Sequence, residues 1–426
     1  MSVPAVGATY LRRQLGRTAA GSLRSRKLHL ITMDNKSVVT KKVTATILSM
    51  SLLTVMAGAA VAPALGIIRQ HFADAPDLQV QLIVSLPALF IIVTNLCFRS
   101  ISRHLGSRTI ALVGLVLYVA AGGGCFFLDN INVILVMRAL LGVSVGLIMP
   151  LSTGLLSYYF PPEEQARMMG LSAAMNQMGG VVGTLLAGLL ASVEWNYAFL
   201  VYVLALVALL MVFLWLPNEH LAAPGDRKEP VKAKQLLRFH PSVIGMFLLT
   251  VVFFIFPTNF AIIESSKLGL AASVITLIMV ALDLVAFFAG LVFGGLMARF
   301  SRQLKYVPPV LLIVGFLLYA FPGNVAAVLV GSALIGTANG FGVPYMLTIG
   351  SLKAGKDAAT TVMPLLSAAL YLGQFISPLL VMPMAKGIFG EADITGPYKV
   401  AVAISVLYLV QAWATRRFQC LPDSKN

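Results

Sequence analysis

The sequence predicts an all-α membrane protein in which twelve transmembrane helices form two pseudo-symmetric six-helix bundles. Two observations lead to this fold class: a composition too apolar for a water-soluble protein, and a second half that repeats the first. Hydrophobic residues make up 58% of the 426 residues and charged residues only 11%, whereas a soluble protein carries about 25% charged residues. Lipid cannot hydrogen-bond to free backbone groups, and the apolar stretches of about 20 residues do not alternate with period two, so helices are expected rather than a barrel.

The repeat relates the two halves at an offset of 194 to 196 residues. The segment from Arg138 to Pro150 returns at 332–344, 171–175 returns at 366–370, and 52–55 returns at 248–251. Matches in the same order indicate one bundle that has been duplicated. Two such halves facing each other are typical of membrane transporters with a site between them.

The apolar stretches define the elements in chain order. The predicted spans are 43–66, 79–98, 109–128, 131–153, 168–191 and 196–216, followed by 242–263, 271–297, 307–322, 325–349, 360–385 and 398–415. They form an N-terminal six-helix bundle at 43–216 and a C-terminal six-helix bundle at 242–416. A cytoplasmic linker rich in Pro, Lys and Arg joins them at 217–241, and a cytoplasmic tail follows at 417–426.

Charge predicts the orientation. With a cytoplasmic N-terminus, 26 of the 31 Lys and Arg lie on the inner side, Arg138 lies within a span, and four lie outside: Arg69, Lys267, Lys386 and Lys399. This is the positive-inside pattern, so both termini are expected in the cytoplasm. The net charge of +15 therefore reflects topology, and no nucleic-acid partner is expected.

Residues 1–42 are predicted to be a basic, disordered cytoplasmic tail. They carry nine Lys and Arg, one acid and no long apolar core, so a cleaved signal peptide is not expected. Two interpretations stay open: an organelle transit peptide, or a solvated tail or upstream extension for which Met33 is the natural start.

Several motifs resemble the major facilitator superfamily, and within it the drug–proton antiporter branch. The six-plus-six plan, the basic central loop and the first span from Leu53 to Leu65 carry the resemblance over about residues 43–416. The segments 159–167 and 194–201 resemble the family sequences that flank spans four to six. Span five resembles the antiporter motif in its glycines only, at Gly179, Gly180, Gly183 and Gly188, because the proline of the motif is absent.

The loop between spans two and three resembles the family motif G-x-L-x-D-R-x-G-R-R in part. Gly106 and Arg108 match, while Arg103 stands where the family has an aspartate. The resemblance implies a gating loop that latches the two halves, although the carboxylate of the family's usual charge relay is absent here. The predicted gating and inter-bundle loop residues are Arg103, Gly106, Arg108, Arg299 and Arg302. The alternative is that these cations only set the topology.

Arg138 with Gly142 and Gly146 resembles the fourth-span motif R-x-x-x-G-x-x-x-G. The resemblance implies a part for Arg138 in proton coupling. An arginine two turns into an apolar helix must face the bundle interior, water or a counter-charge, and the alternative is an arginine that snorkels to the outer interface. The glycines lie on one helix face and allow a neighbouring helix to approach closely.

Asp283 is the predicted proton carrier, because no other acid lies so deep in any span. An unpaired carboxylate at the bilayer centre costs several kcal/mol, so it should be protonated, paired or facing water. Direct binding of a cationic substrate and a structural role are the alternatives. Glu264, near the outer end of span seven beside Lys267, is expected to be solvated.

A central cavity between the halves is expected to be lined by polar and aromatic side chains, since buried amides need partners. The candidates are Thr54, Asn176, Gln177, Phe256, Asn259, Asn339, Tyr371 and Gln374. Helix-to-helix contacts are the alternative role for each.

The predicted function is secondary active transport of small amphipathic molecules by alternating access, as proton-coupled efflux. The alternative is a proton-coupled or facilitative importer of a small metabolite or nutrient. An enzyme is not expected, because the sequence contains no nucleophile–base set, metal cluster, P-loop or dinucleotide fingerprint. The expected partners are a small-molecule substrate, protons and the bilayer, with no cofactor and no metal. The protein is expected to act as a monomer in the plasma or inner membrane.

Overall fold

The computed structural model of the protein describes residues 41–160, 162–219, 239–300, 303–321 and 324–415. Helices are the only regular elements among these residues, which confirms the predicted all-helical fold class. Eleven helical segments in this described part are long and apolar enough to cross a membrane. The shorter apolar helix Leu304–Ala320 stands at the predicted ninth span.

The first half contains six helical passages. In chain order its elements are α2 (Lys41–Ala59), η1 (Ala62–Ala64) and α3 (Leu65–His71); α4 (Asp77–His104); α5 (Ser107–Tyr118), η2 (Val119–Gly123) and η3 (Gly124–Phe127); α6 (Ile131–Tyr159); α7 (Pro162–Ala191); and η4 (Trp195–Leu204) with α8 (Ala205–Trp215). The 3-10 helices η1, η3 and η4 and the π-helical segment η2 form parts of these passages.

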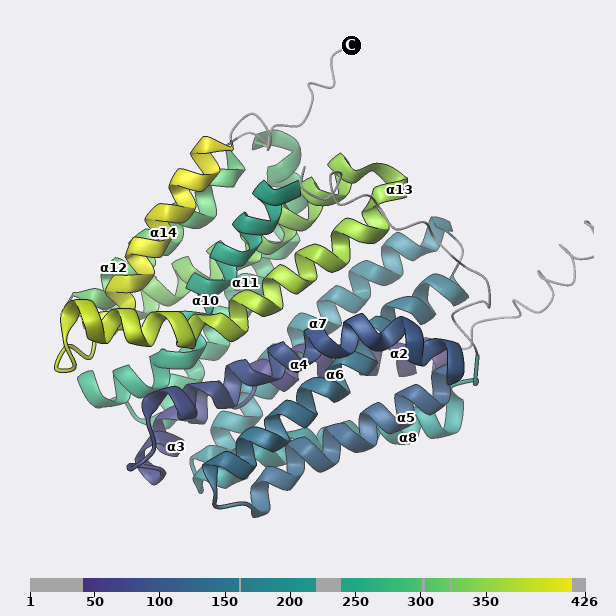
Figure 1. Ribbon diagram of the computed structural model, residues 1–426, viewed down its shortest axis with the longest axis horizontal. Coiled ribbons are helices and arrows are strands. Elements are labelled where there is room, and N and C mark those ends of the chain that lie inside the picture. Colours follow the sequence, from purple (N-terminus) through teal and green to yellow (C-terminus); the bar gives the residue numbers. More distant parts are fainter. Residues whose placement is uncertain (1–40, 161, 220–238, 301–302, 322–323, 416–426) are drawn as a thin grey trace, which may run out of the picture.

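The second half contains α10 (His240–Lys267), α11 (Ala272–Phe300), η6 (Leu304–Tyr306), α12 (Val307–Ala320), α13 (Val325–Phe389) and α14 (Gly396–Ala414). The long element α13 supplies two spans, Val325–Gly350 and Val362–Phe389. A Cβ at Gly350 would lie 2.5 Å from the Leu366 side chain, although a straight helix would hold these residues about 24 Å apart. The element therefore folds back on itself (Figure 1).

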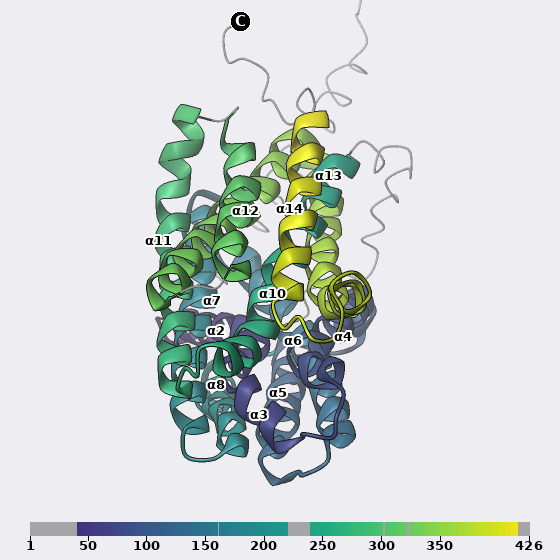
Figure 2. The ribbon, with the colours of Figure 1, turned by 90° about the vertical axis from the view of Figure 1, so that its left-hand side faces the viewer.

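The helices of the two halves gather on opposite sides of the molecule in both ribbon views (Figures 1 and 2). We call the end that carries α3 and the 390–395 turn the α3 end, and the end where α2 begins and α14 ends the opposite end. The predicted bundle boundaries and orientation stay predictions. Most of the linker at 217–241 and of both tails lies outside the described residues, as does Arg302.

Several helices run beyond the apolar stretches that predicted them. The second predicted span ends at residue 98, whereas α4 continues to His104 through Arg99 and Arg103. Helical hydrogen bonding needs no apolar side chains once the chain leaves the hydrocarbon region, so hydropathy marks the membrane-spanning part and not the helix end.

The repeated glycines allow the same close contact between two helices in each half. There is no room for a Cβ at Gly142, which lies against the Pro87 carbonyl of α4. In the second half, a Cβ at Gly336 would lie 2.6 Å from the Leu282 carbonyl oxygen of α11. The fourth span thus packs on the second, and the tenth on the eighth, through one small-residue motif.

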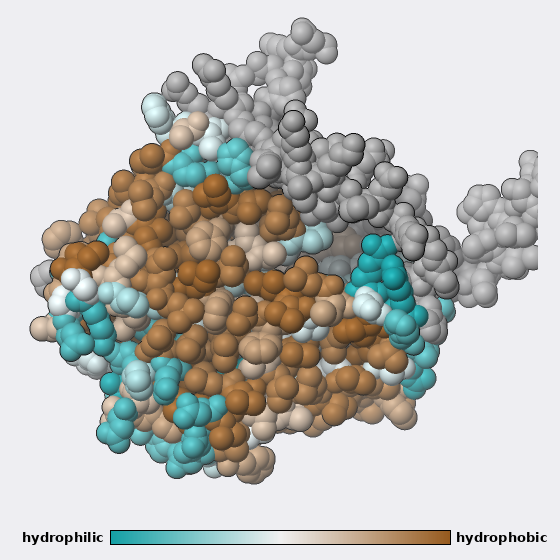
Figure 3. Space-filling view, in the orientation of Figure 1, coloured by the Kyte–Doolittle hydropathy of each residue, from teal (hydrophilic) through white to brown (hydrophobic). Residues whose placement is uncertain are grey.

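The outer surface is apolar around the middle of the molecule. Figure 3 shows a broad hydrophobic band on the visible face, with hydrophilic residues at the two ends of the helices. Large exposed side chains such as Leu96, Leu277 and Phe288 belong to this lipid-exposed surface. An apolar belt between polar ends fits a bilayer, and the protein is a multi-pass membrane protein.

Candidate functional site

The two halves are in direct contact at the α3 end. A Cβ at Gly66 would lie 2.7 Å from the carbonyl oxygen of Ala261, so α3 and α10 touch backbone to backbone. Close by, Gln81 Nε2 of α4 donates a hydrogen bond of 2.8 Å to Asn259 Oδ1 of α10. Both amides are almost completely buried. We refer to this contact between α3, α4 and α10 as the seam.

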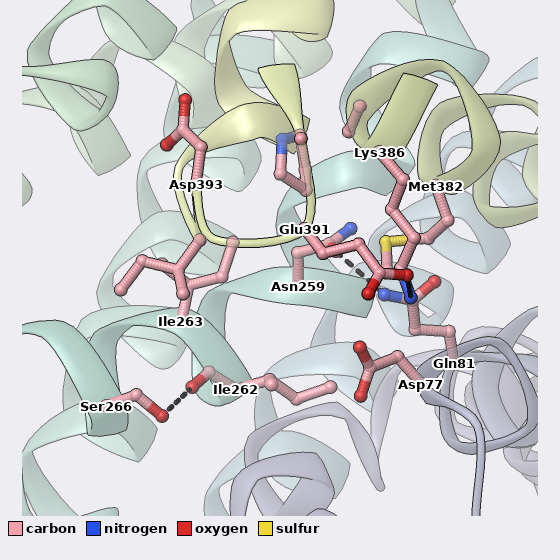
Figure 4. A pocket seen from close by; sticks show the side chains of 14 residues that line it. Asp77, Gln81, Asn259, Ile262, Ile263, Ser266, Met382, Lys386, Glu391 and Asp393 are labelled. Atoms are coloured by element: carbon pink, nitrogen blue, oxygen red, sulfur yellow. Dashed lines mark hydrogen bonds and ion pairs between the residues drawn. The ribbon is translucent and has the colours of Figure 1, made fainter. Parts of the chain in front are cut away.

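A small cavity of about 120 Å³ lies at the seam. Figure 4 shows the hydrogen bond between Gln81 and Asn259 among the side chains that line the cavity, with Asp77, Lys386 and Glu391 nearby. Gln81 Oε1 is buried and has no hydrogen-bond partner. The cavity is bordered by α4 from one half and by α10, α13 and α14 from the other.

Asp283 makes a hydrogen bond across the two halves. Thr184 Oγ1 of α7 donates to Asp283 Oδ2 of α11 over 3.1 Å. On the same two helices, the Cβ position of Gly188 lies against the Thr276 side chain. The carboxyl is half-buried and Thr184 is 1% exposed, so the acid lies where α7 and α11 meet.

The lipid-exposed side of α11 lies away from this carboxyl. Leu277 and Phe288 are 60% and 59% exposed. At about 100° per residue, Asp283 is displaced by about 120° to 140° from them around the helix axis. Its side chain therefore faces the protein interior, as an acid at this depth requires.

Two predicted cavity residues meet within the first half. Thr54 Oγ1 of α2 donates to Asn176 Oδ1 of α7 over 2.7 Å, and the hydroxyls of Ser51 and Ser172 lie 2.7 Å apart one turn away. Gln177 is half-buried beside Asn176. This row of polar contacts joins the first and fifth spans.

Among the predicted cavity residues of the second half, some reach across to the first half and Phe256 packs within its own half. Tyr371 Oη donates to Met149 Sδ of the other half over 3.0 Å, and Gln374 Nε2 lies 3.4 Å from the Val84 carbonyl oxygen of α4. Both side chains therefore reach across between the halves. Asn339 is half-buried on α13.

Phe256 packs within the second half. It is 2% exposed and stacks on Phe260, with ring centroids 4.6 Å apart. Its ring also stacks on that of Tyr319, 6.2 Å away. These rings pack α10 against α12 inside the second half, and a place for Phe256 in the substrate cavity stays a prediction.

Arg138 is completely buried and does not snorkel. Its guanidinium donates to the Ile83 carbonyl over 2.6 Å, to Tyr202 Oη over 2.6 Å and to the Ala57 carbonyl over 2.8 Å. The Tyr202 ring also lies 5.3 Å from the guanidinium carbon. Arg138 thus ties α2, α4, α6 and η4 together through neutral acceptors, and its coupling role stays a prediction.

Two of the gating-loop candidates, Gly106 and Arg108, contact the last helix of the first half and the start of the linker. Gly106 packs against Asn218, and the Arg108 backbone amide donates to Asn218 Oδ1 over 3.2 Å. The Arg108 guanidinium donates to the Phe213 carbonyl. Arg103 and Arg299 are exposed. A latch between the halves stays a prediction for these residues.

Glu264 corrects the sequence-based expectation of a solvated acid. It is 0% exposed, because α10 turns its side chain towards α12 and α14, where Tyr398 Oη donates to Glu264 Oε1 over 3.2 Å. Lys267 does not pair with it. Instead Lys267 Nζ donates to the Tyr319 carbonyl over 2.8 Å.

Sequence reasoning also missed Thr184 and Gln81 as partners across the halves. A threonine or a glutamine in a span gives no signal by itself, because its partner lies on a distant span. Tyr398 could have been found, since it stands 196 residues after Tyr202, within the repeat offset.

Comparison with known proteins identifies relatives of much of the membrane portion. The family model described as Major Facilitator Superfamily matches residues 47–378. Quinolone resistance protein NorA of Staphylococcus aureus is 25% identical over 232 residues, which cover 52% of this chain and 57% of that protein. Multidrug resistance protein 3 of Bacillus subtilis is 25% identical over 107 residues, which cover 25% of this chain and 21% of that protein.

A solved structure shares the fold. The crystal structure of a D-xylose–proton symporter superposes with a TM-score of 0.71 at 16% identity, covering 90% of this chain and 98% of that one. The matches to the two curated relatives span only about a fifth and somewhat over half of their lengths. Their printed activities therefore enter only as support for a proposal.

Proposed function

The chain belongs to the Major Facilitator Superfamily, a family of membrane transporters and not of enzymes, and we propose that it is a secondary transporter that exports small amphipathic molecules in exchange for protons. The observation that carries this proposal is the hydrogen bond of Asp283 to Thr184 across the two halves. The names of the multidrug and quinolone resistance relatives support the substrate class and the direction.

The way in which the halves meet supports alternating access. The seam closes the α3 end through Gly66 and Ala261 and through Gln81 and Asn259. Rocking of the halves must break these contacts to open that end. Arg138 supports such rigid-body motion, because its buried contacts join four elements of the first half.

Asp283 is the proposed proton carrier of this cycle. A carboxyl between α7 and α11 changes its surroundings whenever these helices separate, since Thr184 is then withdrawn. A proton shifts the conformational equilibrium only if it binds with different affinity in the two states. The Thr184 hydroxyl supplies such a difference, because it stabilises the carboxyl only when the halves are in contact.

The substrate chemistry is proposed from the side chains between the halves. Tyr371 and Met149 offer an aromatic face and a polarisable thioether, while Thr54 and Asn176 offer polar contacts. Adaptable methionine and aromatic surfaces suit amphipathic molecules of varied shape. We further propose the plasma membrane as the location, with both termini in the cytoplasm.

Transport by purified protein in proteoliposomes tests the proposal. With an imposed pH gradient and a lipophilic cation such as ethidium as the probe, the wild type should move the probe against its concentration gradient. Asp283→Asn should abolish this gradient-driven movement and retain exchange of the probe at equal pH. Asp74→Asn, an exposed loop acid, is the matched control and should behave as the wild type.

Gradient-driven movement that survives in Asp283→Asn would overturn the assignment of the proton carrier. Accumulation of a labelled metabolite by intact cells, without movement of amphipathic probes, would instead identify the protein as an importer. Transport assays in vesicles that hold the protein in one known orientation then determine the direction of transport.

A further inference from the structure

Each half contains one pair of buried tyrosines on its third and sixth spans. Tyr118 of α5 and Tyr202 of η4 have ring centroids 5.7 Å apart. Tyr319 of α12 and Tyr398 of α14 have ring centroids 5.1 Å apart. All four side chains are 0% exposed. The repeat thus builds the same aromatic pair twice.

The two pairs hold groups of opposite charge type. In the first half, Arg138 donates to Tyr202 Oη over 2.6 Å. In the second half, Tyr398 Oη donates to Glu264 Oε1 over 3.2 Å. The position equivalent to Arg138 is Ser332, which carries no charge. The equivalent tyrosines therefore bind different groups: Tyr202 binds an arginine from the fourth span, and Tyr398 binds an acid from the seventh span.

Glu264 has fewer partners than an ionised carboxylate needs. Its Oε2 atom is buried and has no hydrogen-bond partner, and the side chain is 0% exposed. Lys267, one turn along the helix, directs its ammonium to the carbonyls of Tyr319 and Phe321. Burying a charged carboxylate with one neutral donor costs far more than burying a neutral carboxyl.

Among the described residues, Lys267 is the cation whose charge acts on Glu264, but it forms no ion pair with the carboxyl. The ionisable groups that face Glu264 are Lys267 on its own helix, Tyr319 on α12 and Tyr398 on α14. The charged groups on neighbouring elements at the α3 end form their own pairs: Arg69 with Asp77, Lys386 with Glu391, and Lys399 with Asp393.

The helix that carries Glu264 also forms the seam. Ala261, one turn before Glu264, lies against Gly66, and Asn259 binds Gln81 across the halves. The cavity at the seam is bordered by Ile263, the residue next to Glu264. Opening of the α3 end would therefore move the part of α10 that carries Glu264.

We propose that Glu264 is a second proton-binding site, which holds a proton while the seam is closed and exchanges it with water when the α3 end opens. The proton moves from Oε2 to a water molecule. The carboxylate that remains accepts hydrogen bonds from the Tyr398 hydroxyl and from water. This inference rests on the proposed alternating-access function and adds a site distinct from Asp283.

Infrared difference spectroscopy of the reconstituted protein tests proton binding directly. In Asp283→Asn, a carbonyl band of a protonated, buried carboxyl should remain at neutral pH. It should disappear in the Asp283→Asn/Glu264→Gln double variant and persist in Asp283→Asn/Glu391→Gln, which removes an 82% exposed acid at the same end. Tyr398→Phe should move the band, because it removes the hydrogen bond to Oε1.

The proposal is overturned if the band is missing in Asp283→Asn or remains in the Glu264 double variant. In transport, Glu264→Gln should change gradient-driven efflux at least threefold and alter its dependence on the pH at the α3 side, while exchange at equal pH stays within twofold of wild type. Unchanged efflux would remove Glu264 from coupling. If the wild type moves no probe, the proposed function fails, and the infrared band still decides whether Glu264 binds a proton.

Discussion

Thr184 and Asp283 lie 99 positions apart and on different halves, yet a hydrogen bond of 3.1 Å joins them. The bond places the deepest acid of the spans at a contact between the halves, which the proposed rocking would change. In the proposed cycle Thr184 is therefore a positioning residue for Asp283.

Thr184→Val should weaken proton-driven transport about tenfold, because a hydrogen bond to an ionisable group contributes about 1.5 kcal/mol. Thr184→Ser keeps the hydroxyl and should restore the rate. Gradient-driven efflux and exchange at equal pH, measured in parallel in proteoliposomes, separate coupling from transport. A valine variant with wild-type efflux would show that the hydrogen bond has no part in coupling.

Arg138→Met should lower the stability of the protein by about 3 kcal/mol, since it leaves buried carbonyls without their charged donor. Ser332→Ala, at the equivalent position of the second half, removes one neutral hydrogen bond to Tyr319 and should cost about 1 kcal/mol. Thermal unfolding in detergent measures both. Equal losses of stability in the two variants would contradict the difference between the charged contact of Arg138 and the neutral contact of Ser332.

Gly66→Val should hold the α3 end open, because any Cβ at this position meets the Ala261 carbonyl. The substitution Ile263→Cys, made in a variant that lacks the native cysteines, reports on opening of the α3 end, because Ile263 is only 6% exposed. Labelling of the new cysteine by a membrane-impermeant maleimide should rise several-fold. Gly124→Val, where a Cβ would meet nothing within 4 Å, should leave the labelling rate unchanged, and a similar rise in this control would argue against the seam.

The turn between α13 and α14 should make stability depend on pH. Hydrogen bonds from Lys399 and Thr395 lower the pKa of Asp393 below its usual value. A lowered pKa in the folded state means that the stabilisation is present above the unfolded pKa, about 4, and is lost as pH falls through the folded value. Because the pair is partly exposed, it should contribute less than about 1 kcal/mol.

Asp393→Asn tests this pH dependence. The variant should melt below the wild type at neutral pH, and the difference should shrink as the pH falls below about 4. Melting temperatures of both proteins across this range provide the measurement. A difference that does not change with pH would assign the effect to the turn geometry and not to the charge.

The burial of Glu264 shows where sequence reasoning stops. Its position beside Lys267 near a span end predicted a solvated acid, and the rotation of α10 instead points it at Tyr398. Hydropathy places a residue along the membrane normal but does not specify which neighbouring helix it faces.

The sequence by itself determined the membrane class, the twelve-span plan, the duplication and the depth of Asp283 and Arg138, since each follows from local composition or from a repeat. The tertiary structure alone decided the partners: Thr184 for Asp283, the Ile83 and Ala57 carbonyls for Arg138, and Gln81 for Asn259. The reason is physical. The lipid environment dictates which segments span, whereas the partner of each buried polar group depends on how helices distant in sequence rotate and pack against one another.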